Sequence, residues 1–98
     1  MIKHLEQNEN LQEFVKSGVY IVDFYADWCG PCKMMGSVLE GMNDVNVVKV
    51  NTDLHQELSR EYGVMSIPTL VFFKDGQKVK QEVGYKDESA IRNILNSI

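Results

Sequence analysis

Two cysteines, Cys29 and Cys32, lie two residues apart where an apolar run gives way to a helical pattern. Residues 19–25 have the pattern of a strand, and apolar residues then recur at helical spacing from Cys32 to Met42. Cys29 is therefore expected at the N-terminus of a helix, where unpaired backbone N–H groups and the helix dipole favour an anion. A thiolate there is a nucleophile for disulfide exchange, and Cys32 lies one turn further on, within reach of it.

The rest of the chain predicts strands and helices in the order βαβαβαββα. Two runs, 19–25 and 45–50, are apolar on both faces, as in central strands that are covered on both sides. Asp75-Gly76 between two further strand patterns is a strong hairpin signal, and Asp87 is expected to cap a last amphipathic helix. We therefore predict an α/β fold in a single domain, residues 1–98, with a mixed five-stranded sheet and helices on both faces. The expected strands are 2–5, 19–25, 45–50, 69–73 and 78–83.

Composition excludes several classes of function. The net charge is −4 and there is no basic run, which argues against nucleic acids and anionic membranes as partners. No N-terminal apolar segment has the length of a signal-peptide core or a membrane-spanning helix, so a cytoplasmic location is expected. The chain is also expected to be a monomer. Since the only two cysteines form one close pair, they close no long loop and are expected to serve chemistry.

A structural zinc site and a static disulfide are the two alternative uses of a close cysteine pair. Zinc needs about four ligands. The only histidines, His4 and His55, have no paired spacing and are both expected to be solvated. Redox exchange without a metal is therefore the expected role of the cysteines.

Asp23 and Lys49 each interrupt an apolar strand pattern. Burial of Asp23 would raise its pKa toward neutrality, so that its carboxyl could take the Cys32 proton directly or through one water. The alternative for Asp23 is a purely structural role as a polar residue. Lys49 could oppose this shift if its strand lies beside that of Asp23, or its side chain could instead extend to the edge of the sheet.

Residues 27–33, Asp-Trp-Cys-Gly-Pro-Cys-Lys, follow an apolar strand, and matching segments continue through the chain. With Ile67-Pro68-Thr69, Lys74-Asp75-Gly76 and Val83-Gly84 downstream, the chain resembles the thioredoxin family over nearly its whole length. The resemblance implies the thioredoxin fold and a protein disulfide reductase that forms a redox-active Cys29–Cys32 disulfide and binds no cofactor. It also implies two kinds of partner, disulfide-containing proteins and an NADPH-linked thioredoxin reductase.

The resemblance further assigns site residues. It makes Asp23 the base for Cys32, and it makes the peptide bond before Pro68 cis, against the usual preference for trans. The backbone before this proline would pair with a bound substrate like an added strand. Tyr85 differs from the small residue expected there, and Trp28 or Tyr85 could equally be ordinary packing. The implied substrate surface consists of Trp28, Gly30, Pro31, Met65, Ser66, Ile67, Pro68, Gly84 and Tyr85.

Two other functions stay open at this point. The chain could be a docking or holdase module whose thiols are secondary, or a disulfide oxidase or isomerase. Gly30-Pro31 between the cysteines resembles the reducing branch of the family and argues against the second. One departure from the family is Ser37, preceded by Gly36, where relatives carry a helix proline. We expect the Gly-Ser pair to bend the helix there.

Overall fold

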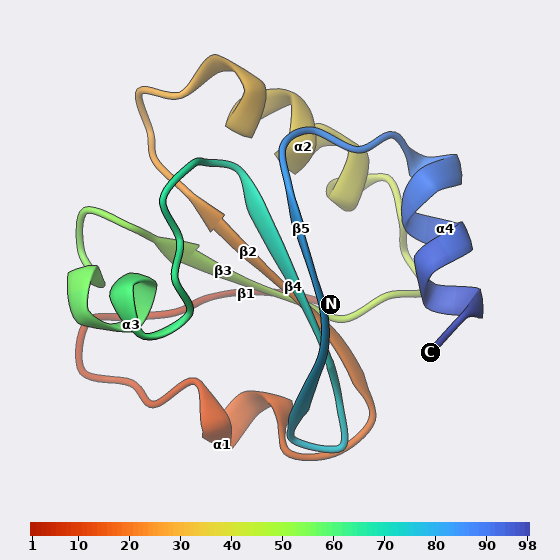
Figure 1. The fold of residues 1–98 in the computed structure, drawn as a ribbon, viewed down its shortest axis with the longest axis horizontal. Coiled ribbons are helices and arrows are strands. Elements are labelled where there is room, and N and C mark those ends of the chain that lie inside the picture. The colour runs from red at the N-terminus through yellow and green to blue at the C-terminus, as the bar shows by residue number, and fades with distance from the viewer.

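The computed structural model describes residues 1–98 and confirms the predicted order of elements (Figure 1). The strands differ from the expected ranges by at most two residues at either end, and the helix Gly30–Glu40 ends two residues before Met42. None of the helices combines the length and the apolar character that a membrane-spanning segment needs. The elements are β1 (Ile2–His4), α1 (Gln12–Val15), β2 (Val19–Tyr25), α2 (Gly30–Glu40), β3 (Val47–Asn51), α3 (Gln56–Glu61), β4 (Thr69–Lys74), β5 (Gln77–Val83) and α4 (Glu88–Asn96).

The five strands form one mixed sheet in the order β1-β3-β2-β4-β5. β3 pairs in parallel with both β1 and β2, while β4 is antiparallel to β2 and β5 is antiparallel to β4. The expected α/β fold with its mixed sheet is confirmed. β2 lies at the centre, which explains why its sequence is apolar on both faces.

Helices cover both faces of the sheet, α1 and α3 on one and α2 and α4 on the other (Figure 1). Because successive side chains on a strand point to opposite faces, Val22 and Phe24 of β2 pack with the α1 and α3 core, whereas Ile21 packs with α2 and α4. Asp23 shares the face of Ile21. The alternation of β2 therefore places a carboxyl group beneath the helix that carries Cys32.

The turn between β4 and β5 is the predicted hairpin. Asp75 and Gly76 both have positive φ, 50° and 87°, as a two-residue hairpin turn requires. The turn is also tied to the segment before β2, because Gly18 N–H donates to Asp75 Oδ1 at 2.8 Å and Asp75 N–H donates to the Gly18 carbonyl at 2.9 Å. These bonds fix β4 and β5 against the end of β2 that lies away from the cysteines.

Helix α2 begins directly after Cys29, which is its N-cap residue. Pro31 lies in the first turn, where its missing N–H costs nothing. The helix continues without interruption through Gly36 and Ser37 to Glu40. The bend expected at that pair stays a prediction.

Candidate functional site

Cys29 and Cys32 form a disulfide at the N-terminus of α2, with their Cα atoms 5.2 Å apart. The Cys32 backbone N–H donates to Cys29 Sγ at 3.2 Å. This N–H is one of the groups that a helix N-terminus leaves without a backbone partner. After reduction the same donor and the helix dipole would stabilise a Cys29 thiolate.

Asp23 is fully buried on β2, and neither oxygen of its carboxyl group accepts a hydrogen bond. Its partner in the parallel register is Lys49 of β3, whose Nζ lies 3.7 Å from Asp23 Oδ2. Burial raises the pKa of Asp23 to about 6, and the Lys49 ammonium opposes this shift without cancelling it. The carboxyl group is thus poised to exchange a proton near neutral pH.

Lys49 lies beside Asp23, which was one of the two arrangements considered for it. Its side chain is mostly buried, with 12% exposed, and its ammonium lies 4.4 Å from the centre of the Tyr25 ring. It therefore does not extend to the edge of the sheet. The sequence could not decide between the two arrangements of Lys49, because the register between β2 and β3 sets the position of its side chain.

A cavity of about 290 Å³ borders Cys32 and Lys49. Cys29 does not line it. A cavity of this size can hold several waters next to Cys32, although Asp23 itself does not line it. Its lining residues are His4, Tyr25, Ala26, Asp27, Cys32, Lys33, Gly36, Glu40 and Lys49.

The other side of the disulfide faces the segment before β4. The Ile67–Pro68 peptide bond is cis, as the resemblance implied, and the Ile67 carbonyl oxygen lies 3.9 Å from Cys29 Sγ. Gly84 N–H donates to the Pro68 carbonyl at 2.7 Å, so two separate parts of the predicted substrate surface are in contact. The resulting surface holds a carbonyl group next to the sulfur that is expected to react.

The remaining residues of the predicted surface are mostly solvent-exposed. Met65 is 96% exposed and Trp28 is 72% exposed. Tyr85 is 40% exposed. Gly30, Pro31 and Ser66 are also exposed, although the Ser66 carbonyl accepts a hydrogen bond from Thr69 Oγ1 at 2.6 Å.

One residue near the disulfide, Asp53, was missed as a candidate. Its Oδ2 accepts a hydrogen bond from Trp28 Nε1 at 3.1 Å, and its backbone N–H donates to Asn51 Oδ1 at 2.9 Å. Because β2 and β3 are parallel neighbours, the loops that follow them lie at the same edge of the sheet. That adjacency could have suggested a polar partner for the Trp28 indole.

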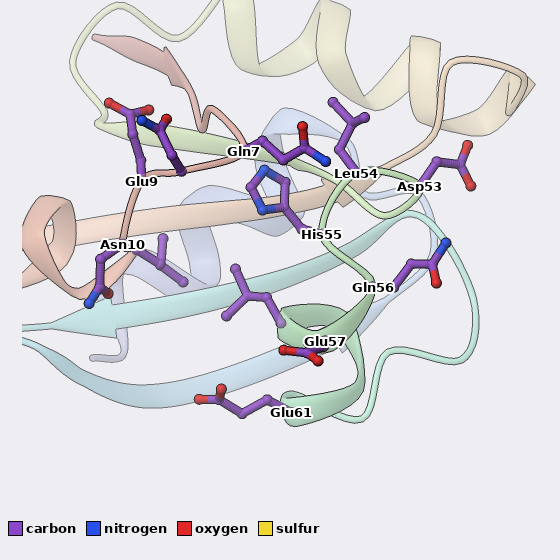
Figure 2. A pocket seen from close by; sticks show the side chains of 12 residues that line it. Gln7, Glu9, Asn10, Asp53, Leu54, His55, Gln56, Glu57 and Glu61 are labelled. Atoms are coloured by element: carbon purple, nitrogen blue, oxygen red, sulfur yellow. The ribbon is translucent and has the colours of Figure 1, made fainter.

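The largest cavity, about 720 Å³, lies between the β1–α1 segment and α3 and contains no cysteine (Figure 2). His55 lines it but is 9% exposed, and its Nε2 lies 3.1 Å from the Leu5 carbonyl oxygen. The prediction that both histidines are solvated is therefore wrong for His55, because a backbone carbonyl partners its ring. His4 is exposed as expected.

No group of three His, Cys, Asp or Glu side chains could hold a metal ion.

Comparisons with known proteins agree with this geometry. The model of the family described as Thioredoxin matches residues 2–97. A thioredoxin of Chlamydia caviae is 45% identical over 92 residues, 90% of each chain, and one of Bacillus subtilis is 45% identical over 84 residues, 81% of each chain. Among solved structures, a mutant thioredoxin from Halobacterium salinarum superposes with a TM-score of 0.88 at 38% identity, covering 98% of this chain and 88% of that one.

Proposed function

The chain belongs to the thioredoxin family and is a thiol–disulfide oxidoreductase that works through Cys29 and Cys32, and we propose that it is a general reductase of protein disulfides in the cytoplasm, acting as a single-domain monomer. The observation that carries this proposal is the hydrogen bond that the Cys32 N–H donates to Cys29 Sγ at the start of α2. This bond supports the proposal that Cys29 is the sulfur that carries the negative charge.

The first step of the proposed reaction takes place at Cys29. Its thiolate attacks one sulfur of a target disulfide, the target S–S bond breaks, and one target sulfur leaves as a thiolate. The product is a mixed disulfide between Cys29 and the target. The Ile67 carbonyl, 3.9 Å from Cys29 Sγ, is placed to accept a hydrogen bond from the backbone of the bound target.

The second step takes place at Cys32. The Asp23 carboxylate takes the Cys32 proton, directly or through water, and the Cys32 sulfur attacks Cys29 Sγ. The mixed disulfide breaks, the second target sulfur leaves as a thiolate, and the Cys29–Cys32 disulfide forms. The target gains two electrons and this chain loses two. No cofactor takes part.

Return to the dithiol form requires an electron donor. We assign this role to an NADPH-linked thioredoxin reductase, on the basis of the family. A cytoplasmic location fits such a cycle, because glutathione and related systems keep thiols reduced there. The substrate surface would be Trp28, Gly30, Pro31, residues 65–68, Gly84 and Tyr85.

Reduction of insulin disulfides, with dithiothreitol as the electron donor, tests the proposal. Cys29→Ser is expected to abolish the reaction, whereas Cys32→Ser is expected to accumulate a covalent complex with the target, because the second step is blocked. A Cys29→Ser variant that kept most of the activity would overturn the assignment of the nucleophile. Wild-type protein that binds partners but leaves insulin oxidised would favour a docking module instead.

A further inference from the structure

Gly36 occupies the middle of α2, where glycine destabilises a helix relative to alanine. It is buried, and a Cβ atom added there would lie 3.1 Å from Lys49 Nζ. That distance is shorter than nearly all contacts that real Cβ atoms make. A side chain at this position would therefore push the ammonium group, at the end of the flexible lysine side chain, by a few tenths of an ångström.

Tyr25 borders the same ammonium from a second direction. It lies on β2 two residues after Asp23, so both side chains are on one face of the sheet. The Tyr25 ring centre is 4.4 Å from Lys49 Nζ, within the range of a favourable cation–π contact. Lys49 Nζ thus has the Tyr25 ring, the Gly36 backbone and the Asp23 carboxyl group as its neighbours.

We propose that Gly36 and Tyr25 are positioning residues that seat the Lys49 ammonium against Asp23 and so set how readily Asp23 accepts the Cys32 proton. This inference rests on the proposed function, in which Asp23 serves Cys32. Its physical basis is that the attraction between two charges falls with their separation, and falls steeply where little solvent screens it. A small retreat of the ammonium changes the proton affinity of a fully buried carboxyl group.

Other charged groups face this region. His4, Asp27, Lys33 and Glu40 line the cavity that Lys49 borders, and all four are exposed to solvent, which screens them. On the opposite side, the β4 residue paired with Asp23 is the uncharged Leu70, and α2 contributes the sulfur of Cys32. Lys49 is therefore the charged group with the strongest influence on Asp23.

The first experiment measures the pH midpoint of Asp23 by carbon-13 NMR of its carboxyl group in the disulfide form, where no thiol titrates. Gly36→Ala should move Lys49 Nζ away from Asp23 Oδ2, from which it now lies 3.7 Å. A Cβ atom at 3.1 Å requires its neighbour to move by a few tenths of an ångström. A retreat of about 0.3 Å from Asp23 raises the midpoint by about a quarter of a pH unit at an effective dielectric constant of about 20. Tyr25→Leu should raise it in the same direction, whereas Tyr25→Phe keeps the ring and should leave it unchanged.

Gly41→Ala is the matched control, because Gly41 caps the same helix and a Cβ there would meet no group nearer than the Val38 carbonyl oxygen at 3.5 Å. It should leave the midpoint unchanged. In a Lys49→Met background, Gly36→Ala should also have no effect, since the ammonium is gone. A shift that persists without Lys49, or no shift from Gly36→Ala in the presence of Lys49, overturns the inference.

The second experiment follows resolution of a mixed disulfide formed with a peptide thiol between pH 5 and pH 9. Gly36→Ala should shift the midpoint of the rate profile upward by about the same quarter of a pH unit, with the plateau rate at high pH unchanged. A lower plateau with an unshifted midpoint would indicate a merely structural effect and contradict the inference. If wild-type protein fails to reduce insulin, the proposed function fails, while the NMR titration still decides whether Gly36 seats Lys49.

Discussion

Asp23 and Lys49 are register partners on β2 and β3, yet their closest charged atoms are 3.7 Å apart and neither oxygen of the carboxyl group accepts a hydrogen bond. One ammonium is the only polar compensation that the fold provides for a fully buried carboxylate. The folded protein should therefore hold the Asp23 proton more tightly than the unfolded chain does.

Asp23→Asn should stabilise the protein at alkaline pH. Burial raises the pKa of Asp23 from 3.8 to about 6, so wild-type stability falls as pH rises through this interval, because the folded state binds more protons there. The two-unit difference corresponds to about 3 kcal/mol, so the variant should gain roughly 2 to 3 kcal/mol at pH 8 and little at pH 4. Urea unfolding across this pH range measures the gain. Parallel pH profiles for the two proteins would contradict the prediction.

Asp53→Ala should weaken binding of protein targets. The Trp28 side chain is 72% exposed and has its indole fixed by the bond to Asp53. A freed indole must be immobilised again on binding, at about 0.5 to 1.5 kcal/mol, which predicts a KM for insulin about 2 to 10 times higher. Reduction of a small aromatic disulfide should hardly change. Asp53→Asn keeps an acceptor and serves as the control, and an unchanged KM for the alanine variant would disprove the role of the bond.

Met65→Glu should also raise KM for protein targets. Met65 is 96% exposed and lies two residues before Ile67, whose carbonyl faces Cys29. A charge in an apolar contact must lose its water on binding, so KM for insulin should rise severalfold while the rate with a small disulfide stays the same. Val79→Glu, at an exposed apolar position on β5, is the matched control. Equal effects of the two substitutions would place Met65 outside the docking surface.

Asp87→Ala should destabilise the protein without affecting catalysis. Asp87 Oδ1 accepts the Ala90 N–H at 2.9 Å and caps α4, far along the chain from the disulfide. Loss of such a cap costs about 1 kcal/mol, or roughly 4 to 8 °C in Tm for a domain of this size. Asp87→Asn should stay within a few tenths of a kcal/mol of wild type. Thermal unfolding measures both, and a wild-type Tm for the alanine variant would contradict the prediction.

The sequence predicted those features that depend on local signals. β2 has the predicted bounds because its apolar run is bordered by Gly18 on one side and by the cysteine motif on the other. Asp75-Gly76 forms the predicted turn, since both residues tolerate positive φ. Asp87 caps α4 as expected, since its side chain needs only a donor three residues away.

Features that depend on distant neighbours were not predictable. His55 is buried because the Leu5 carbonyl, 50 residues away in the chain, lies beside its ring. The neighbour of Gly36 was likewise not predictable, because a Cβ atom at this position would lie 3.1 Å from the ammonium of Lys49 on β3. A periodic pattern shows which face of an element is buried, but not which polar group lies opposite each residue.

The two sulfurs of the disulfide border different surroundings, Cys29 the carbonyl of Ile67 and Cys32 the cavity shared with Lys49. Electrons would therefore be exchanged with the target at Cys29, while protons would be exchanged with solvent at Cys32. The residues of the proposed docking surface and those lining the cavity do not overlap. With the roles proposed above, partner choice and acid–base tuning would diverge independently in evolution, and substitutions at residues 65–67 would retarget such a chain without changing its response to pH.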